Sequence, residues 1–179
     1  FDPNNYRGIC VSSNLGKLFC SILNSRLQDF LSEHNVLSKS QIGFTPQHRT
    51  TDHIYTLHTL IHKHVHQNKK IFSCFVDFKK AFDSIWHNGL FLKLIENGVG
   101  GKTHDIIKTM YTNNKCAVKI GNMETDFFPQ SRGVKQGCSL SPTLFNIYID
   151  PHYLKKARHA AREKSTVTIP SSVITFEDA

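Results

Sequence analysis

Apolar residues recur at helical spacing in two long segments of the first third of the chain. In the first segment they recur every three or four positions up to Asn35, and Ser13 is a suitable N-cap for a helix there. The second segment extends from Thr51 to Gln67, with an apolar stripe at Ile54, Leu57, Ile61 and Val65. The pattern therefore predicts two amphipathic helices, each packing its apolar stripe against a core.

A different pattern follows at residues 71–76, where apolar residues rich in aromatic and β-branched types form a short continuous run. Such a run predicts a buried strand, and Asp77 comes where that strand would end. Burial disfavours an ionised carboxylate, so we expect Asp77 to be either a structural acid satisfied by donors or a metal ligand. Lys79 and Phe82 follow on the predicted turn from strand to helix.

The second half of the chain alternates short helices with one hairpin. Apolar spacing predicts a helix that ends at Asn97 and Gly98, and another over residues 102–111. Alternation around the Gly121-Asn122 turn predicts a β-hairpin. Ser141 and Pro142 mark a further helix start, and the glycines just before it allow the backbone to approach a ligand closely.

Two of these segments resemble motifs of reverse transcriptases, most closely those of LINE-type, non-LTR retrotransposons. Residues 75–83, FVDFKKAFD, resemble the family's motif A, and residues 133–142, GVKQGCSLSP, resemble its motif B. Residues 4–9, NNYRGI, and the 40–53 segment with its Gln-x-Gly-Phe sequence are similar to further fingers motifs of that family.

The resemblance implies a set of functional residues. Asp77 would be the catalytic carboxylate and the ligand of Mg²⁺, or of Mn²⁺ as a substitute, because two such ions promote phosphoryl transfer. Phe82 would be the steric gate against a ribonucleotide 2′-OH. The other implied nucleotide-binding residues are Phe78, Arg49, Gln136 and Gly137. Implied contacts to an RNA template and a DNA primer are Arg7, Lys79, Arg132 and Lys135, although a surface role for Arg7 is an equal alternative.

Composition favours an intracellular, nucleic-acid-binding protein. The formal net charge is +8, which favours a polyanionic partner, with an ordinary basic surface as the alternative. The five cysteines are odd in number and lack C-x-x-C spacing, which indicates reduced thiols in the cytoplasm or nucleus. No apolar run approaches the length needed to span a membrane. Histidines recur at every fourth position from His58 to His66, a possible zinc pair, but a flank beside the apolar stripe is the favoured interpretation.

The patterns predict an α+β fold, and the resemblance implies the fingers and a partial palm, whose antiparallel sheet carries Asp77 and is backed by helices. We expect residues 1–150 to form the partial reverse transcriptase domain, and residues 151–179 to be a basic helical and short β tail in which no family motif is recognised. No motif C is found, so we expect a retrotransposon-derived fragment that is catalytically incompetent alone. The alternatives are an active RNA-directed DNA polymerase completed by downstream sequence, or a non-catalytic module that binds RNA or an RNA–DNA duplex. The oligomeric state is not predicted.

Overall fold

The computed structural model describes residues 8–71, 73, 75 and 77–150. Its helices are α1 (Asn14–Glu33), α2 (Thr50–His66), α3 (His87–Glu96), α4 (Gly101–Thr112) and α5 (Ser141–Ile149). Its strands are β1 (Lys115–Cys116), β2 (Lys119–Ile120), β3 (Met123–Glu124) and β4 (Phe128–Pro129). Helices combined with small antiparallel sheets make this an α+β structure, as the sequence predicts. No helix in these described ranges is both long and apolar enough to cross a membrane.

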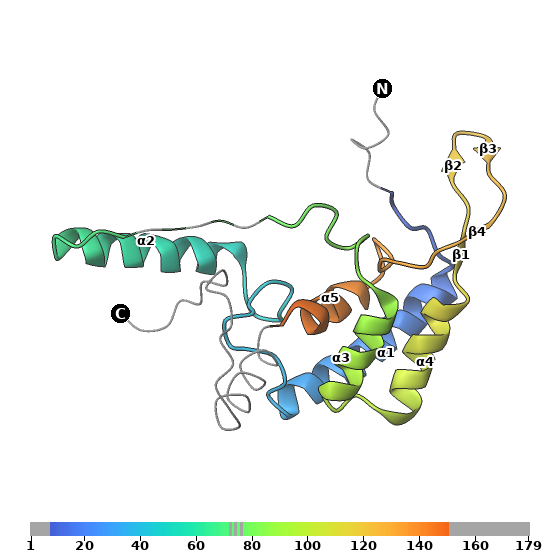
Figure 1. The fold of residues 1–179 in the computed structure, drawn as a ribbon, viewed down its shortest axis with the longest axis horizontal. Coiled ribbons are helices and arrows are strands. Elements are labelled where there is room, and N and C mark those ends of the chain that lie inside the picture. The colour runs from blue at the N-terminus through green and yellow to red at the C-terminus, as the bar shows by residue number, and fades with distance from the viewer. Residues whose placement is uncertain (1–7, 72, 74, 76, 151–179) are drawn as a thin grey trace, which may run out of the picture.

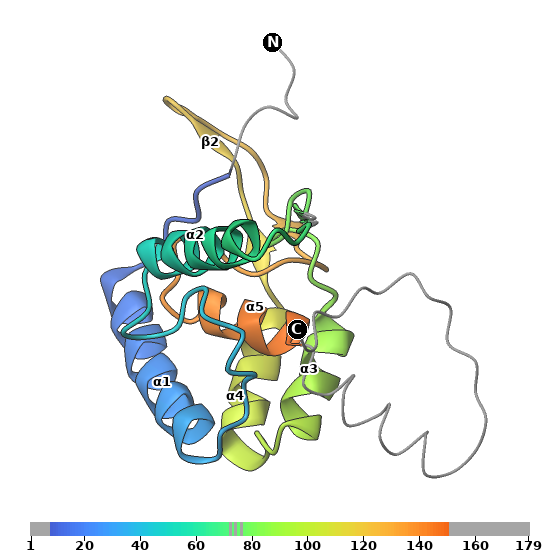
Figure 2. The ribbon, with the colours of Figure 1, turned by 90° about the vertical axis from the view of Figure 1, so that its left-hand side faces the viewer.

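The core lies where α1, α3, α4 and α5 pack together (Figure 2). Helix α5 is the most deeply buried of these helices, and its Leu144 and Ile147 side chains are completely enclosed. Helix α1 contributes one stripe of residues at helical spacing: Cys20, Leu23, Leu27 and Leu31. Its N-terminus is as predicted, because the Ser13 hydroxyl accepts a hydrogen bond from the Gly16 amide at 3.1 Å. The core therefore fixes α5, which follows directly on the motif B segment.

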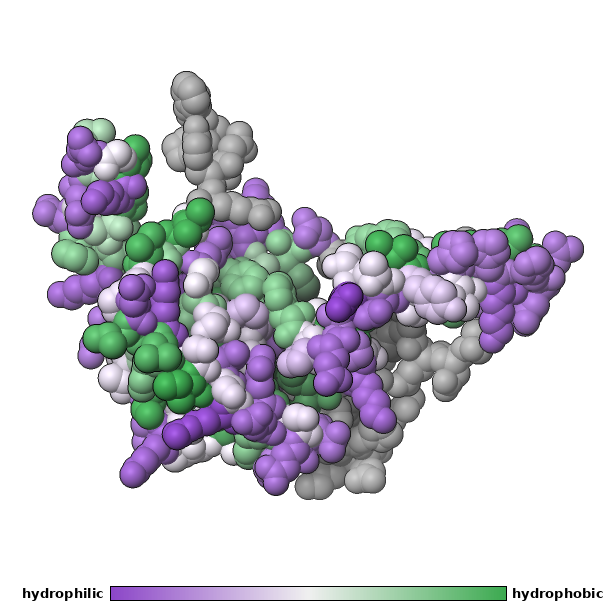
Figure 3. All heavy atoms as spheres, turned by 180° about the vertical axis from the view of Figure 1, so that it is seen from behind, coloured by the Kyte–Doolittle hydropathy of each residue, from purple (hydrophilic) through white to green (hydrophobic). Residues whose placement is uncertain are grey.

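Helix α2 projects away from this core (Figure 1). None of its residues is buried, and Ile54 and Val65 on its apolar stripe are each 63% exposed. The helix forms where the pattern predicts it, but the expectation that its stripe packs against a core is wrong for the described structure. Apolar side chains are visible along the projecting helix in Figure 3. Local spacing determines the helix, whereas packing requires a second surface, and none of the described elements supplies one.

The predicted strand over residues 71–76 is not formed by those of its residues that the structure describes. Ile71, Ser73 and Phe75 are outside any strand, and Phe75 is 82% exposed. Phe72, Cys74 and Val76 lie outside the described residues. Asp77 therefore does not follow a buried strand, and no sheet among the described residues carries it. The physical reason is that an extended run is stable only when neighbouring strands complete its hydrogen bonds, and no described strand lies beside it.

The predicted hairpin is present as a thin antiparallel arm. Strand β1 pairs with β4 and β2 pairs with β3, with Lys119 opposite Glu124 in the outer pair. Gly121 has a φ of +60° at the turn, which confirms the interpretation of the Gly-Asn sequence. Ile120, Met123 and Phe127 on this arm are exposed. The arm connects α4 to the 132–137 loop, which carries motif B residues to the base of α5.

Candidate functional site

The two motif segments meet in the structure, although about 50 residues separate them in the chain. The Val134 amide donates a hydrogen bond to the Phe82 carbonyl oxygen at 2.8 Å, and the Gly133 amide donates to the Ile85 carbonyl oxygen at 2.8 Å. These backbone bonds fix the 132–137 loop against the 82–87 turn. Because backbone groups make these bonds, their existence does not depend on one particular side chain.

Gly133 makes the close approach possible. Its φ is +87°, a conformation that residues with a Cβ rarely adopt. A Cβ at this position would lie 3.0 Å from both the Cα and the carbonyl oxygen of Asp83. The sequence predicts that the motif B glycines let the backbone approach a ligand, whereas the close neighbour of Gly133 in the structure is the protein's own backbone.

Two side chains strengthen the junction, and neither interaction was assigned from the sequence. The Gln136 Nε2 group donates to Asp83 Oδ1 at 2.8 Å, which joins a motif B side chain to the last residue of motif A. His87, buried at the start of α3, donates from Nε2 to the Gly133 carbonyl oxygen at 2.8 Å. A carbonyl oxygen only accepts, so Nε2 must carry the proton. The sequence places Gln136 within motif B and His87 shortly after motif A, but nothing in its spacing reveals their partners.

The far side of the 132–137 loop is held by the N-terminal segment and by α5. The Cys10 amide donates to the Gln136 carbonyl oxygen at 2.9 Å, and the Ser141 hydroxyl donates to the Lys135 carbonyl oxygen at 2.7 Å. Gly137 has a φ of +99°, and a Cβ there would lie 3.2 Å from the Cys10 carbonyl oxygen. The loop is thus fixed from three sides, and Gln136 and Gly137 have defined positions.

The Phe82 ring contacts two other aromatic rings. Its ring stacks on that of Phe145, with 5.0 Å between centroids and 14° between planes. The ring of Phe44 meets it at 90° with 5.8 Å between centroids. Both geometries are favourable for aromatic pairs. Phe82 is partly buried, so one part of its surface remains accessible while two neighbours hold the ring.

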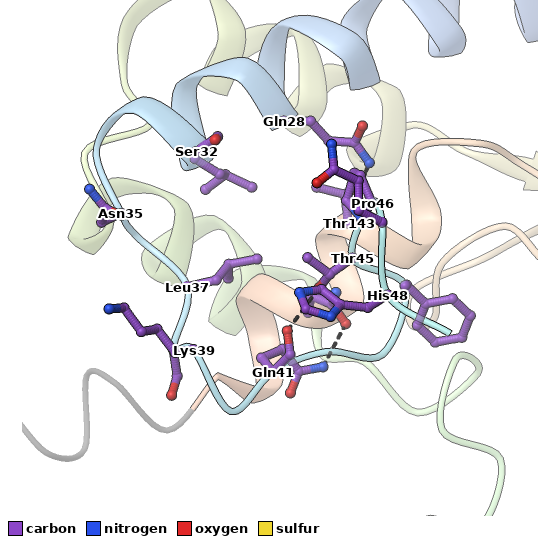
Figure 4. Close-up of a pocket in the computed structure, with 15 residues that line it drawn as sticks. Gln28, Ser32, Asn35, Leu37, Lys39, Gln41, Thr45, Pro46, His48 and Thr143 are labelled. Atoms are coloured by element: carbon purple, nitrogen blue, oxygen red, sulfur yellow. Dashed lines mark hydrogen bonds between the residues drawn. The ribbon is translucent and has the colours of Figure 1, made fainter. Parts of the chain in front are cut away.

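Phe44 reaches the Phe82 ring from the 40–49 loop, which is hydrogen bonded to α5 through Asn146. The Asn146 side chain accepts from Gln41 Nε2 at 3.0 Å and donates to the Gly43 carbonyl oxygen at 2.7 Å. An open cavity of about 330 Å³ lies between residues 35–48 and the helices α1 and α5 (Figure 4). Its polar lining consists of carboxamide and hydroxyl groups together with Lys39 and His48, and it contains no acidic residue.

The structure also describes four of the five cysteines, Cys10, Cys20, Cys116 and Cys138, and all four are free thiols. Burial raises the pKa of the Cys20 thiol to about 11, and a hydrogen bond with Cys138 adds to the rise. Burial likewise raises the pKa of the Tyr111 hydroxyl, which lies under the same loop. These groups remain neutral at physiological pH, as expected of packing residues and not of nucleophiles.

Four of the other predicted site residues lie outside the two segments that meet at this junction. Asp77, Phe78 and Lys79 are exposed, as is Arg49, whose backbone amide and Asp52 form the start of α2. No hydrogen bond or ring contact between described residues joins Asp77 or Phe78 to the 132–137 loop. Arg132 and Lys135 lie in that loop, and the backbone of Arg132 forms an isolated antiparallel β-bridge with that of Trp86. Arg7 lies outside the described residues.

The described residues do not make up a metal centre by themselves. No three His, Cys, Asp or Glu side chains among them are grouped so that they could hold a metal ion. The rings of His58 and His62 lie 4.3 Å apart on α2, and they belong to no such group. Asp77, the carboxylate ligand that the resemblance implies, is exposed and belongs to no such group among the described residues.

Comparison with known proteins identifies the family. Residues 2–169 match the family described as reverse transcriptase (RNA-dependent DNA polymerase). The chain is 27% identical over 159 residues to the probable RNA-directed DNA polymerase from transposon BS of Drosophila melanogaster, covering 89% of this chain and 17% of that protein. It is 26% identical over 147 residues to the RNA-directed DNA polymerase from mobile element jockey of Drosophila funebris, covering 82% and 16%. It is 30% identical over 150 residues to the retrovirus-related Pol polyprotein from type-1 retrotransposable element R2 of Popillia japonica, covering 83% and 20%.

The chain therefore spans a fifth or less of the length of these relatives. The match nevertheless covers both motif segments and every element of the described structure. The chain belongs to the reverse transcriptase family, as a domain of the kind found in the RNA-directed DNA polymerases of non-LTR retrotransposons.

Proposed function

We propose that this chain supplies the fingers and part of the palm of a retrotransposon reverse transcriptase, and that it binds a dNTP together with an RNA template and a DNA primer. In this proposal residues 1–150 form the polymerase part. The tail, residues 151–179, lies outside the described residues. The proposed location is inside the cell, in the cytoplasm or nucleus, in keeping with the free thiols.

The observation that carries the proposal is the junction between the 82–87 turn and the 132–137 loop. The family resemblance assigns Phe82 and Gln136 to one nucleotide site, although they are 54 positions apart in the printed sequence. Their segments are hydrogen bonded to each other, and Gln136 contacts Asp83, the neighbour of Phe82. This agreement supports a site in which the Phe82 ring and the motif B loop receive the base and sugar of the incoming nucleotide.

Basic residues around the junction support nucleic-acid binding. Arg132 and Lys135 lie in the loop, and Lys79 lies before the turn. In the proposal these side chains contact phosphates of template or primer, as would Arg7, and Arg49 contacts the dNTP triphosphate. Phosphate contacts give affinity that depends on salt and is independent of base sequence.

Mg²⁺, with Mn²⁺ as a substitute, is the proposed cofactor, because reverse transcriptases generally use divalent metals. Asp77 would be its ligand and the catalytic carboxylate in this chain, with Phe78 beside it at the nucleotide. The described residues do not complete a two-metal site, which needs further carboxylate oxygens. We therefore assign no chemical step to the metal.

The proposal is tested by measuring binding of a fluorescent RNA–DNA template–primer to the purified chain, with and without the dNTP complementary to the next template base. We expect binding that weakens steeply with salt, and a further increase of several-fold with the complementary dNTP only. Phe82→Ala and Gln136→Ala should remove the dNTP effect while leaving duplex binding in place. Lys17→Ala, on the surface of α1, is the matched control.

Two outcomes would contradict the proposal. A duplex affinity that no dNTP changes would favour a non-catalytic module for RNA or RNA–DNA duplexes. No salt-dependent binding at all would exclude both functions.

Primer extension with Mg²⁺ and then Mn²⁺, in the same samples, measures whether this chain incorporates nucleotides. The Asp77→Asn variant should abolish any incorporation.

A further inference from the structure

Two adjacent residues of α5 hold the Phe82 ring, one directly and one through a loop. Phe145 stacks directly on the ring, whereas Asn146 acts through the 40–49 loop. Asn146 is only 1% exposed, and both polar atoms of its side chain are used by this loop. A buried carboxamide that satisfies a loop in this way specifies one loop conformation, because alternatives leave polar groups unpaired.

The loop conformation decides where Phe44 lies. Asn146 Nδ2 donates to the Gly43 carbonyl oxygen, which belongs to the peptide that precedes Phe44. Phe44 has a φ of +57°, a left-handed conformation that a bulky residue keeps only with outside support. A second bond at the base of the loop, from the Thr45 hydroxyl to the Gln41 carbonyl oxygen at 2.8 Å, closes the same turn (Figure 4).

Phe44 in turn restrains the ring of Phe82. It is 58% exposed, so burial of its own surface does not explain its position, and its recorded ring contact is the edge-to-face contact with Phe82. Phe145 alone would restrain one face of the Phe82 ring. With Phe44 against it as well, the ring has one stacked and one perpendicular neighbour, which leave it little freedom to tilt.

We infer that Asn146 is a positioning residue which, through Phe44, fixes the Phe82 ring and thereby determines how strongly the nucleotide site excludes a ribose 2′-OH. This inference rests on the proposed function, in which Phe82 meets the nucleotide sugar. In this inference Asn146 and Phe44 act on the Phe82 ring and need no contact of their own with the nucleotide. Their effect is on ring placement, and a steric contact is sensitive to displacements well below 1 Å.

The test compares the affinities of the chain–template–primer complex for dGTP and GTP opposite a template cytosine. An apolar contact rejects an added hydroxyl by at most about a hundredfold, which limits the preference that can be lost. Phe44→Leu and Asn146→Leu displace the ring without removing it, so each should reduce the preference for dGTP about tenfold, mainly by strengthening GTP binding. The double variant should lose no more than either single variant, since both act on one ring.

The matched control is Asn24→Leu. Asn24 Oδ1 accepts from the Thr143 hydroxyl at 2.7 Å, so this change also removes a hydrogen bond between α1 and α5, but that bond does not involve the 40–49 loop. Equal loss of selectivity in Asn24→Leu and Asn146→Leu would show a general structural effect and overturn the inference. Should Asn146→Leu fail to fold, the exposed position of Phe44 keeps Phe44→Leu as a decisive variant.

A readout without nucleotide separates failure of this inference from failure of the proposed function. Ring-labelled phenylalanine NMR, with Phe82 assigned through Phe82→Leu, should show a Phe44–Phe82 contact that is lost in Asn146→Leu and kept in Asn24→Leu. Persistence of the contact in Asn146→Leu would overturn the positioning role. A wild-type complex that binds neither nucleotide would overturn the proposed function and the selectivity role, while the ring contact still decides the positioning.

Discussion

Two regions of this reverse transcriptase domain differ sharply in how they are held. The 132–137 loop is hydrogen bonded to the 82–87 turn, to the N-terminal segment and to α5, whose central residues are buried. Helix α2 has no buried residue, and the described residues after it, around Asp77, are exposed. The proposed sugar-contacting half of the site is therefore held in place by this chain's own core, whereas the described residues of the proposed metal-binding half are not.

The difference in burial can be tested by removing one apolar side chain from each region. Leu144→Ala in α5 should destabilise the chain by about 3 kcal/mol, because it leaves a cavity around a completely enclosed side chain. Ile54→Ala in α2 should cost less than about 0.5 kcal/mol, since its side chain is exposed. Urea unfolding measures both. Similar losses in the two variants would mean that α2 packs against something in solution.

Gly133 provides a second test of the junction. Gly133→Ala should cost about 3 kcal/mol, because it combines a positive φ with a clash against the Asp83 backbone. Gly121→Ala, in the turn of the exposed arm, also has a positive φ but meets no atom within 4 Å. It should cost about 1 kcal/mol. Thermal unfolding of the pair isolates the close contact, and equal costs would indicate that the loop does not lie against the turn.

His87 tests the side-chain contribution to the same junction. His87→Phe retains the contacts with Tyr111 and Phe91 but leaves the Gly133 carbonyl oxygen without its donor. It should lower the free energy of unfolding by about 2 kcal/mol. His87→Gln can still donate from its amide, so its loss should be about 1 kcal/mol or less. Hydrogen exchange at residues 133–137 should rise in the phenylalanine variant only, and equal exchange in both would exclude this role.

The smallest expected effect concerns Cys20, beneath the loop. With a pKa of about 11, its thiol should react with iodoacetamide at pH 8 roughly a hundredfold more slowly than an unperturbed cysteine. The neutral thiol is the form that the fold favours, so its contribution to stability is complete below about pH 9 and is lost as the pH rises towards 11. Peptide mapping after timed alkylation, repeated in urea as a control, measures the rate. Rapid alkylation of folded protein would mean that this side of the core is open.

Some of the site follows from local patterns that the sequence displays. The motif segments, the helix start at Ser141 and the glycine at position 133 are all legible, because each reflects a requirement of the adjacent backbone. The strand before Asp77 was predicted on the same kind of pattern, and that prediction is wrong for its described residues. An apolar run indicates that burying these side chains would be favourable, but a strand also needs neighbouring strands to pair with, and the run does not provide them.

The amino-acid sequence is sufficient to recognise the family, the helical segments, the hairpin and the residues of the two motifs. The folded structure was needed to show that Gln136 contacts Asp83, that His87 holds Gly133, and that Asn146 fixes the loop carrying Phe44. It also decided that α2 projects with its apolar stripe exposed. Helix and turn formation depend on neighbours in the chain, which a sequence lists in order. Contacts across 46 to 103 positions depend on how the core aligns whole elements, and no local spacing encodes that alignment.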